Sequence, residues 1–242
     1  MSTADMPGSA PRYRSLSVIV PVYNERNTVG EIIRRMRLVD LPIEREIIVV
    51  NDGSVDGTDK VLAALEDSTV RVRSHSTNRG KGAAIRTGID AARGDVVLIQ
   101  DADLEYDPQD WPRLLAPLLL GKAQVVYGSR YIGEREAASL ARWLGDRSLA
   151  LLTALLFNTA ISDVETGYKV VDRVVLDGLN IEADRFEFEP EITARLLRRG
   201  QRIYEVPVTY SGRAQHEGRK FTWRDDLVAA WTLLRLRFQR LH

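Results

Sequence analysis

The sequence has no cysteine and only three histidines in 242 residues. Without cysteine the chain can form no disulfide, no thiolate zinc site and no cysteine nucleophile, and it is compatible with a reducing cytoplasm. His75, His216 and His242 lack the spacing of metal ligands, so we assign them no role. Any metal chemistry must therefore use oxygen ligands.

A net charge is also lacking, because 34 lysines and arginines balance 34 aspartates and glutamates. No overall field draws nucleic acid to such a surface, so we expect no nucleic-acid partner and only local basic sites. The most apolar stretch, residues 149–161, is shorter than the roughly 20 residues that cross a bilayer. Residues 1–14 have no apolar core, which predicts a flexible tail rather than a secretory signal.

What the sequence does have is the composition of a globular protein, 44% hydrophobic and 28% charged. Between residues 16 and 127, short β-branched runs alternate with helical patterns, which predicts a mainly parallel central sheet flanked by helices. We therefore expect an α/β fold in a single domain over residues 15–242. The expected strands are 16–22, 46–51, 70–74, 95–100 and 123–127, with extended pieces near 165–171 and 202–208. The expected helices are 28–38, 58–66, 81–92, 112–120, 143–157, 190–199 and 223–240.

Two aspartates, Asp101 and Asp103, follow the strand expected at 95–100, in the segment Gln100-Asp101-Ala102-Asp103-Leu104-Glu105. Ligands of open parallel sheets bind beyond the carboxyl ends of the strands, where this segment lies. Side chains two residues apart in an extended strand point to the same side, and two such carboxylates repel unless a cation lies between them. Hard oxygen ligands select Mg²⁺ or Mn²⁺, which would also bind phosphate groups. An Asp-x-Asp sequence is also common in solvated loops, and that alternative stays open here.

Two other polar turns follow expected strands. The turn at 51–54 offers the Asp52 carboxylate to a base or a ribose, although such a turn is also an ordinary strand-to-helix connection. The segment at 78–82 opens a helix, where free backbone amides, the helix dipole and the Lys81 ammonium favour an anion such as diphosphate. The glycines of this segment could equally serve only to shape the loop.

Taken in order, several segments resemble the family 2 glycosyltransferases, which have the GT-A (Rossmann-like) fold. These segments are PVYNE (21–25), NDGS-x-DGT (51–58), NRGKG (78–82), QDADLEYDP (100–108) and GSR (128–130). In the second half, DVETGYK (163–169) and the basic, glycine-containing stretch at 210–220 are similar to the polyprenyl-phosphate branch, which includes dolichyl-phosphate mannose and glucose synthases. We therefore expect a nucleotide-sugar half at 15–130 and an acceptor half at 131–242.

The resemblance implies roles for individual positions. It implies that the nucleotide is bound by Pro21, Tyr23, Glu25 and Asp52. It implies that Asp101 and Asp103 lie at the metal and the diphosphate, and that Arg130, Arg213 and Lys220 contact phosphate groups of the donor or acceptor during catalysis. Glu105, which stands where mannose synthases often have glutamine, is the candidate third metal ligand, and Asn51 stands where many relatives have aspartate. The implied cofactor is Mg²⁺ or Mn²⁺.

A phosphate acceptor needs less catalytic help than a sugar hydroxyl. A hydroxyl requires a general base, whereas a phosphate monoester is mostly ionised at neutral pH and can attack once cations position it. We therefore expect an inverting transfer of a hexose from a GDP-mannose- or UDP-glucose-type donor to a dolichyl or undecaprenyl phosphate, on the cytoplasmic face of the membrane. A basic collar would guide the lipid phosphate through Arg142, Arg147, Arg213, Arg219, Lys220 and Arg224. The alternatives are a family 2 enzyme with a soluble or glycan acceptor, and a non-catalytic binding module.

The C-terminal helix carries an apolar stripe formed by Leu227, Ala230, Trp231, Leu234, Phe238 and Leu241. Such an amphipathic helix could lie on a membrane surface, which would make the protein a peripheral membrane protein. It could equally pack on its own domain or on a second copy in a homo-oligomer. The same alternatives hold for residues 148–157.

Overall fold

The computed structural model describes residues 12–65, 69–132, 140–212 and 223–239. In these ranges the strands form one seven-stranded sheet in the order β3-β2-β1-β4-β6-β5-β7. Strand β6 runs antiparallel to both of its neighbours, β4 and β5, and the other pairings are parallel. The strands are β1 (Ser15–Val22), β2 (Glu44–Asn51), β3 (Val70–Ser74), β4 (Val96–Ile99), β5 (Val125–Ser129), β6 (Lys169–Asp172) and β7 (Ile203–Pro207).

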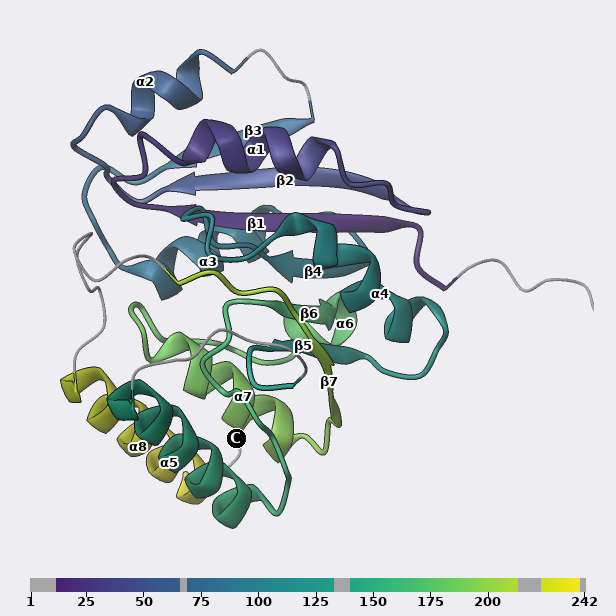
Figure 1. Cartoon of the computed structure of the whole chain (residues 1–242), viewed down its shortest axis with the longest axis vertical. Helices are drawn as coiled ribbons and strands as arrows, with labels where there is room; N and C mark the ends of the chain where they lie inside the picture. The colour runs from purple at the N-terminus through teal and green to yellow at the C-terminus, as the bar shows by residue number, and fades with distance from the viewer. Residues whose placement is uncertain (1–11, 66–68, 133–139, 213–222, 240–242) are drawn as a thin grey trace, which may run out of the picture.

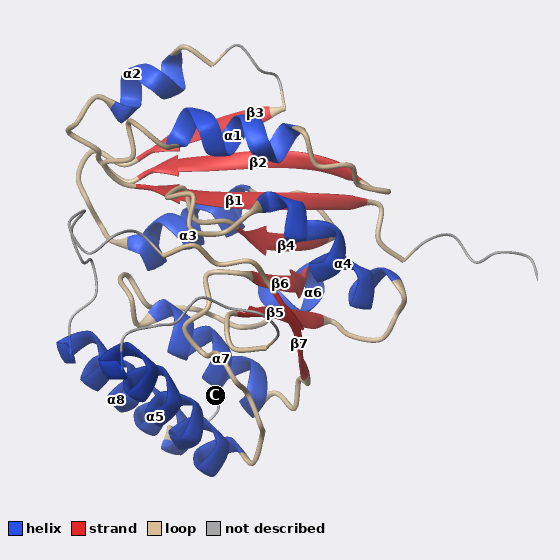
Figure 2. Ribbon diagram, in the orientation of Figure 1, coloured by secondary structure: helices blue, strands red, loops and turns tan. Residues whose placement is uncertain are grey.

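Helices cover both faces of the sheet (Figure 2). One hydrophobic core lies under α1, α2 and α4, and the other lies under α3, α6 and α7, with α5 and α8 packed outside α7. The helices are α1 (Val29–Arg37), α2 (Thr58–Ala63), α3 (Lys81–Ala91), α4 (Trp111–Leu119), α5 (Leu140–Phe157), α6 (Arg173–Asp177), α7 (Phe188–Arg198) and α8 (Trp223–Phe238), with a short 3-10 turn, η1 (Pro108–Asp110).

The central strands β1, β4, β5 and β6 are buried on both faces because both cores need apolar side chains, whereas the edge strands β3 and β7 are partly exposed. In β1, Val18 and Val20 point into the first core and Ile19 points into the second. In β4, Leu98 likewise points into the first core and Ile99 points into the second. This burial explains why the strands read as continuous β-branched runs rather than as alternating patterns.

The expected α/β class is confirmed, and each expected strand and helix is present with boundaries shifted by a few residues. Pro112 lies in the first turn of α4, after Asp110, where its missing N–H costs nothing. Helix α6 and turn η1 were not expected. The expected tail also needs a correction, because Tyr13 is buried and its hydroxyl donates to Asp172 over 2.8 Å. The packed chain therefore begins before residue 15.

Candidate functional site

The PVYNE, NDGS-x-DGT and QDADLEYDP segments meet at one edge of the sheet, where the parallel strands end (Figure 1). Tyr23 follows β1, Asp52 follows β2, and Asp101 lies just beyond the end of β4. Strand β1 pairs with both β2 and β4, so these strand ends are neighbours. The fold thus gathers these residues at the edge where open parallel sheets bind ligands.

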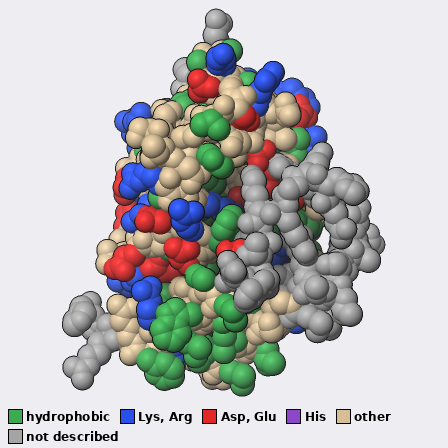
Figure 3. All heavy atoms as spheres, turned by 90° about the vertical axis from the view of Figure 1, so that its left-hand side faces the viewer, with side chains coloured by type: hydrophobic (Ala, Val, Ile, Leu, Met, Phe, Trp, Pro, Cys, Tyr) green, Lys and Arg blue, Asp and Glu red, His purple; other side chains and the backbone are tan. Residues whose placement is uncertain are grey.

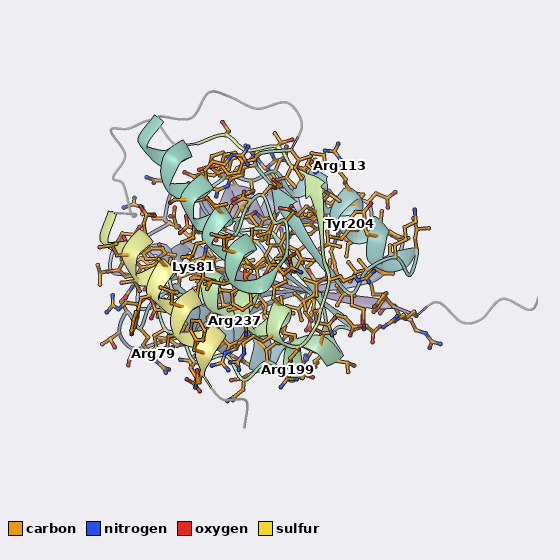
Figure 4. The ribbon with its side chains drawn as sticks, turned by 90° about the horizontal axis from the view of Figure 1, so that it is seen from below. Arg79, Lys81, Arg113, Arg199, Tyr204 and Arg237 are labelled. Carbon is orange, nitrogen blue, oxygen red and sulfur yellow. The ribbon has the colours of Figure 1, made fainter. Side chains whose placement is uncertain are left out.

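Lys81, at the start of α3, joins the end of β4 to the start of α7. Its Nζ lies 2.9 Å from Asp101 Oδ1 and 2.9 Å from Glu189 Oε1. Burial alone would lower the pKa of Lys81, but the two carboxylates outweigh burial and hold this pKa well above its ordinary value. In the view from below, Lys81 lies inside the outline of the molecule, whereas Arg79 lies near its edge (Figure 4). The sequence did not single out Glu189.

Asp101 has a close neighbour in Gly167. A Cβ atom on Gly167 would lie 2.2 Å from Asp101 Oδ2 and 3.0 Å from Tyr106 Cε2. The N–H of Gly167 donates to the Tyr106 hydroxyl over 3.0 Å, which fixes the loop in this position. Glycine is therefore required here so that the Asp101 carboxylate can occupy its place.

Asp103 and Glu105 lie in the turn after Asp101, but the structure does not gather the three carboxylates into one ligand cluster. Asp103 Oδ1 accepts from the Glu105 N–H over 3.2 Å, and Glu105 Oε2 accepts from the Tyr210 hydroxyl over 2.7 Å. Within the described residues, no three His, Cys, Asp or Glu side chains are arranged to hold a metal ion. The site nevertheless suits a cation, because Asp101 already binds one in Lys81. Mg²⁺ or Mn²⁺ at Asp101 and Asp103, with Glu105 as a third ligand, stays a prediction.

The Asp52 carboxylate is buried and binds groups of the protein itself. Its oxygens accept from the backbone N–H of Arg79 over 2.9 Å and from that of Gly80 over 2.8 Å. His75 Nδ1 lies 2.6 Å from Asp52 Oδ1, and His75 Nε2 lies 2.9 Å from Thr87 Oγ1 on α3. Asp52 and His75 therefore link β2 to α3. We had assigned no role to His75 from the sequence. The contact of Asp52 with the nucleotide stays a prediction.

The backbone amides before and in the first turn of α3 are less available to an anion than expected. Those of Arg79 and Gly80 are bonded to Asp52, and the N–H of Ala83 donates to Asp184 O over 2.9 Å. A Cβ on Gly80 would lie only 2.3 Å from the same Asp184 oxygen. The expectation of free amides is wrong for these three groups, and the glycine permits close backbone packing. The Lys81 side chain remains the predicted contact with diphosphate.

Two of the predicted nucleotide contacts in the PVYNE segment differ in exposure, because Tyr23 is exposed and Glu25 is buried. Tyr23 is 38% exposed at the end of the sheet, and Pro21 is part of β1. Glu25 is buried, and its Oε2 accepts from the Thr28 hydroxyl over 2.7 Å. The backbone N–H of Glu25 donates to Thr58 Oγ1 over 3.0 Å, which links the starts of α1 and α2. The predicted nucleotide contacts of Pro21, Tyr23 and Glu25 remain predictions.

Arg130 forms a bidentate ion pair with Asp163. Its Nε lies 2.7 Å from Asp163 Oδ2, and its Nη2 lies 2.7 Å from Asp163 Oδ1. The two side chains are only 9% and 1% exposed, so the pair is buried. The predicted phosphate contact of Arg130 stays a prediction. Arg213, Arg219 and Lys220, together with the side chains of Arg142 and Arg224, lie outside the described part of the chain.

Lys169, at the start of β6, is a buried cation with backbone partners. Its Nζ donates to Val164 O over 3.2 Å and to Thr166 O, and it lies 4.6 Å from the centroid of the Tyr127 ring. Burial lowers the pKa of Lys169 to about 8. Lys169 thus anchors the loop that carries Gly167 to Asp101.

Helices α5 and α8 pack side by side (Figure 1). Both helices carry exposed apolar side chains. Helix α8 packs inward through Ala229, Leu233 and Leu236, which do not belong to the predicted apolar stripe. Of that stripe, Ala230 packs against the second core, whereas Leu227, Trp231 and Phe238 are exposed. Leu241 lies outside the described residues. Figure 3 faces the carboxyl ends of the strands and shows a hydrophobic area at its lower end, where these helices lie. We call the exposed set the α5–α8 apolar face: Leu151 (61% exposed), Leu155 (75%), Leu227 (61%), Val228 (46%), Trp231 (65%) and Phe238 (76%).

None of the helices in the described ranges is long and apolar enough to cross a bilayer. This agrees with the short apolar stretch at 149–161, most of which forms the end of α5. Among residues of the site, Glu189 and Gly167 were missed as contacts of Lys81 and Asp101. Glu189 belongs to the acidic run FEFEPE at the start of α7, and nothing in that run points to its distant partner.

Residues 17–177 match the family model described as glycosyl transferase family 2. The chain is similar to the polyprenol monophosphomannose synthase of Mycolicibacterium smegmatis, with 32% identity over 217 residues, which cover 84% of this chain and 79% of that protein. It is also similar to the undecaprenyl-phosphate mannosyltransferase of Micrococcus luteus, with 30% identity over 214 residues, which cover 83% of this chain and 85% of that protein.

Solved structures agree with this assignment. The glucosyl-3-phosphoglycerate synthase of Mycobacterium tuberculosis, crystallised with Mn²⁺, UDP and phosphoglyceric acid, superposes with a TM-score of 0.71 at 25% identity, over 93% of this chain and 79% of that chain. Its complex with Mn²⁺, UDP-glucose and phosphoglyceric acid gives 0.71 at 26% identity, over 93% and 80%. Since the family match runs from β1 through α6, across the whole edge that holds Asp52, Lys81 and Asp101, the chain belongs to glycosyl transferase family 2 and is a glycosyltransferase.

Proposed function

We propose that the protein transfers a hexose from a nucleotide-sugar of the GDP-mannose or UDP-glucose type to the phosphate of a polyprenyl lipid, such as dolichyl or undecaprenyl phosphate. The transfer inverts the anomeric carbon and takes place on the cytoplasmic face of the membrane, with the protein bound peripherally. The named activities of the two curated relatives, both polyprenyl-phosphate sugar transferases, support this acceptor.

The chemistry is a single displacement. An oxygen of the lipid phosphate attacks the anomeric carbon, the bond from that carbon to the β-phosphate oxygen breaks, and the nucleoside diphosphate leaves with the electron pair. Lys81 and the carboxylates of Asp101 and Asp103 line the edge where the diphosphate would lie. A divalent cation bound there would neutralise the charge of the departing diphosphate. Because phosphate is already ionised, no general base is needed.

The observation that carries the lipid acceptor is the α5–α8 apolar face. A polyprenyl chain stays in the bilayer, so an enzyme that uses it must approach the membrane with the side that holds its site. The apolar face lies on that side of the molecule (Figure 3). Arg235 and Arg237 are exposed on α8 beside it, and such side chains favour anionic lipid headgroups. We therefore assign the bilayer surface as the partner of this face.

The first test is sugar transfer from labelled UDP- and GDP-sugars, with Mn²⁺ or Mg²⁺, to polyprenyl phosphate in liposomes that contain anionic lipid. We expect label in the organic-extractable fraction and its loss on addition of a chelator. Transfer that survives complete metal removal would contradict the predicted metal, and label that never enters the lipid would contradict the acceptor.

Trp231→Ser tests the apolar face itself. Trp231 is 65% exposed, so its replacement should leave folding intact but reduce both sedimentation with the liposomes and transfer to lipid severalfold. Val174→Ser is the matched control, because Val174 is 81% exposed on α6, outside this face. Equal liposome binding by both variants would refute the membrane assignment. A wild-type dimer in light scattering that Trp231→Ser converts to a monomer would assign the face to a second copy instead.

A soluble phosphate acceptor is the second candidate function. The solved structures that cover 93% of this chain hold phosphoglyceric acid, which is a soluble phosphate compound. In the same transfer assay, a labelled product that stays in the aqueous phase with added phosphoglyceric acid, and no label in the lipid, would favour this candidate.

A further inference from the structure

Glu189 is a buried carboxylate that is only half satisfied. Its side chain is 7% exposed, and its Oε1 lies 2.9 Å from Lys81 Nζ. Its Oε2 is buried and has no hydrogen-bond partner among the described residues. A buried carboxylate oxygen without a hydrogen-bond partner destabilises the fold, so its presence needs an explanation.

Lys81 Nζ forms ion pairs of equal length with Asp101 and Glu189, because the contacting oxygen of each lies 2.9 Å away. The ammonium therefore already neutralises the carboxylate at which the proposed function places the divalent cation. An ammonium and a divalent cation cannot share one carboxylate oxygen at contact distance without strong repulsion. Asp101 Oδ2 lies against Gly167, so a metal that binds Asp101 through Oδ1 must displace Lys81 from that oxygen. The carboxylate that still holds Lys81 is then Glu189.

We propose that the Lys81 ammonium stands in for the divalent cation at Asp101 in the donor-free protein, and that Glu189 is the positioning residue that holds Lys81 when the metal takes its place. This inference rests on the proposed metal site. When the metal arrives with the donor, Lys81 exchanges Asp101 for the donor diphosphate, and Glu189 Oε2 becomes available to the displaced ammonium. Lys81 then contacts the diphosphate from a position that Glu189 fixes.

The exchange makes metal and nucleotide binding cooperative. The metal alone must remove Lys81 from Asp101 with no new anion to receive it, whereas the metal together with a nucleoside diphosphate provides that anion. By linkage, each ligand raises the affinity for the other by the same factor. Direct contact between the metal and the diphosphate couples the two ligands in any case, and a Lys81 that merely links α3, β4 and α7 would add nothing to that coupling.

The experiment measures Mn²⁺ affinity by the EPR signal of free Mn²⁺, using the full chain with and without UDP or GDP. For the wild type we expect weak Mn²⁺ binding alone and binding at least about tenfold tighter with the matching nucleotide. Lys81→Met should bind Mn²⁺ about tenfold tighter than the wild type when nucleotide is absent. The nucleotide should then strengthen Mn²⁺ binding less than it does in the wild type. Lys60→Met, at an exposed position on α2, is the matched control and should behave as the wild type does.

Glu189→Gln should change the nucleotide-free Mn²⁺ affinity in the opposite direction to Lys81→Met. It keeps the side-chain volume but removes one of the two charges that hold Lys81, so Lys81 pairs more strongly with Asp101. Mn²⁺ affinity without nucleotide should fall below that of the wild type, while the nucleotide still strengthens it. A role of Glu189 in folding alone would lower the melting temperature and leave the Mn²⁺ affinity unchanged, which would overturn its assignment as a positioning residue.

The outcomes separate this inference from the proposed function. Asp101→Asn should abolish Mn²⁺ binding, and if it does not, the proposed metal site fails and the inference fails with it. If Asp101→Asn abolishes binding but Lys81→Met leaves the nucleotide-free Mn²⁺ affinity unchanged or weaker, the metal site stands and the inference alone is wrong. Lys81→Gln, which retains hydrogen-bond donors but no charge, gives the same comparison if Lys81→Met does not fold.

Discussion

The buried ammonium of Lys169 should make the protein more stable as the pH rises above neutrality. Its pKa is about 8 in the fold, against an ordinary value of 10.5 that we take for the unfolded chain. Burial is the main cause, because the interior disfavours the charged form. Between these two pKa values the unfolded chain holds the proton and the folded chain does not, so the free energy of unfolding increases with pH in this window.

The size of the effect follows from the two pKa values. One unit of pKa difference corresponds to about 1.4 kcal/mol, so the complete shift amounts to roughly 3 kcal/mol above both values. Between about pH 7.5 and about pH 9.5, Lys169 should add roughly 2 kcal/mol of this to the free energy of unfolding. Other groups also titrate in this range, so the contribution must be measured as a difference from Lys169→Met, which lacks only this titration.

Urea unfolding followed by tryptophan fluorescence at both pH values provides the assay. Lys169→Met also loses the hydrogen bonds to Val164 and Thr166, but that loss lowers its stability at both pH values and cancels in the comparison. We expect the wild type to gain roughly 2 kcal/mol more than Lys169→Met between the two pH values. The exposed Lys122 gives a control, since Lys122→Met should keep the wild-type pH dependence. An equal pH dependence of wild type and Lys169→Met would refute the reasoning.

Two further substitutions test the site. Gly167→Ala places a Cβ 2.2 Å from Asp101 Oδ2, so we expect metal-dependent nucleotide binding to fall at least about tenfold by calorimetry. The loss of melting temperature should be small because a flexible carboxylate can move. Gly30→Ala, on helix α1 with 3.7 Å from its Cβ to the nearest neighbour, should leave nucleotide binding unchanged and should not lower the melting temperature. Asp163→Ala leaves the Arg130 guanidinium buried without its carboxylate, which should lower the free energy of unfolding by about 3 to 5 kcal/mol in urea, and a loss below about 1 kcal/mol would show that water enters to replace the carboxylate.

The fold was predictable because its determinants are local. Strands β1, β2 and β4 contain short β-branched runs, β3 alternates valine with arginine, and each polar turn marks the place where a strand ends. Pro112 and the preceding Asp110 fixed the start of α4 to within a residue. Helix α6 was missed because Arg173–Asp177 is too short to show helical periodicity. Turn η1 was missed for the same reason.

The site was predictable only in its local part. Asp101 and Lys81 carry a charge pattern that can be recognised within a few residues. Their contacts with Glu189 and Gly167 join segments that lie far apart in the chain, and no spacing rule connects them. His75 was given no role for the same reason, since its partners Asp52 and Thr87 are placed by the packing of α3 on β2.

The reversed strand β6 explains why the loop before it belongs to the site. In a sheet whose other strands run parallel, the chain that enters a strand lies at the edge opposite the carboxyl ends. Because β6 is antiparallel to β4 and β5, its first residue, Lys169, pairs with Ile99 at the end of β4 and with Tyr127 in β5. The loop before Lys169 therefore arrives at the edge that holds Asp101, which lets Gly167 meet Asp101 and Asp163 bind Arg130. A parallel β6 would carry this loop to the other edge of the sheet, so the antiparallel strand is a requirement of the site.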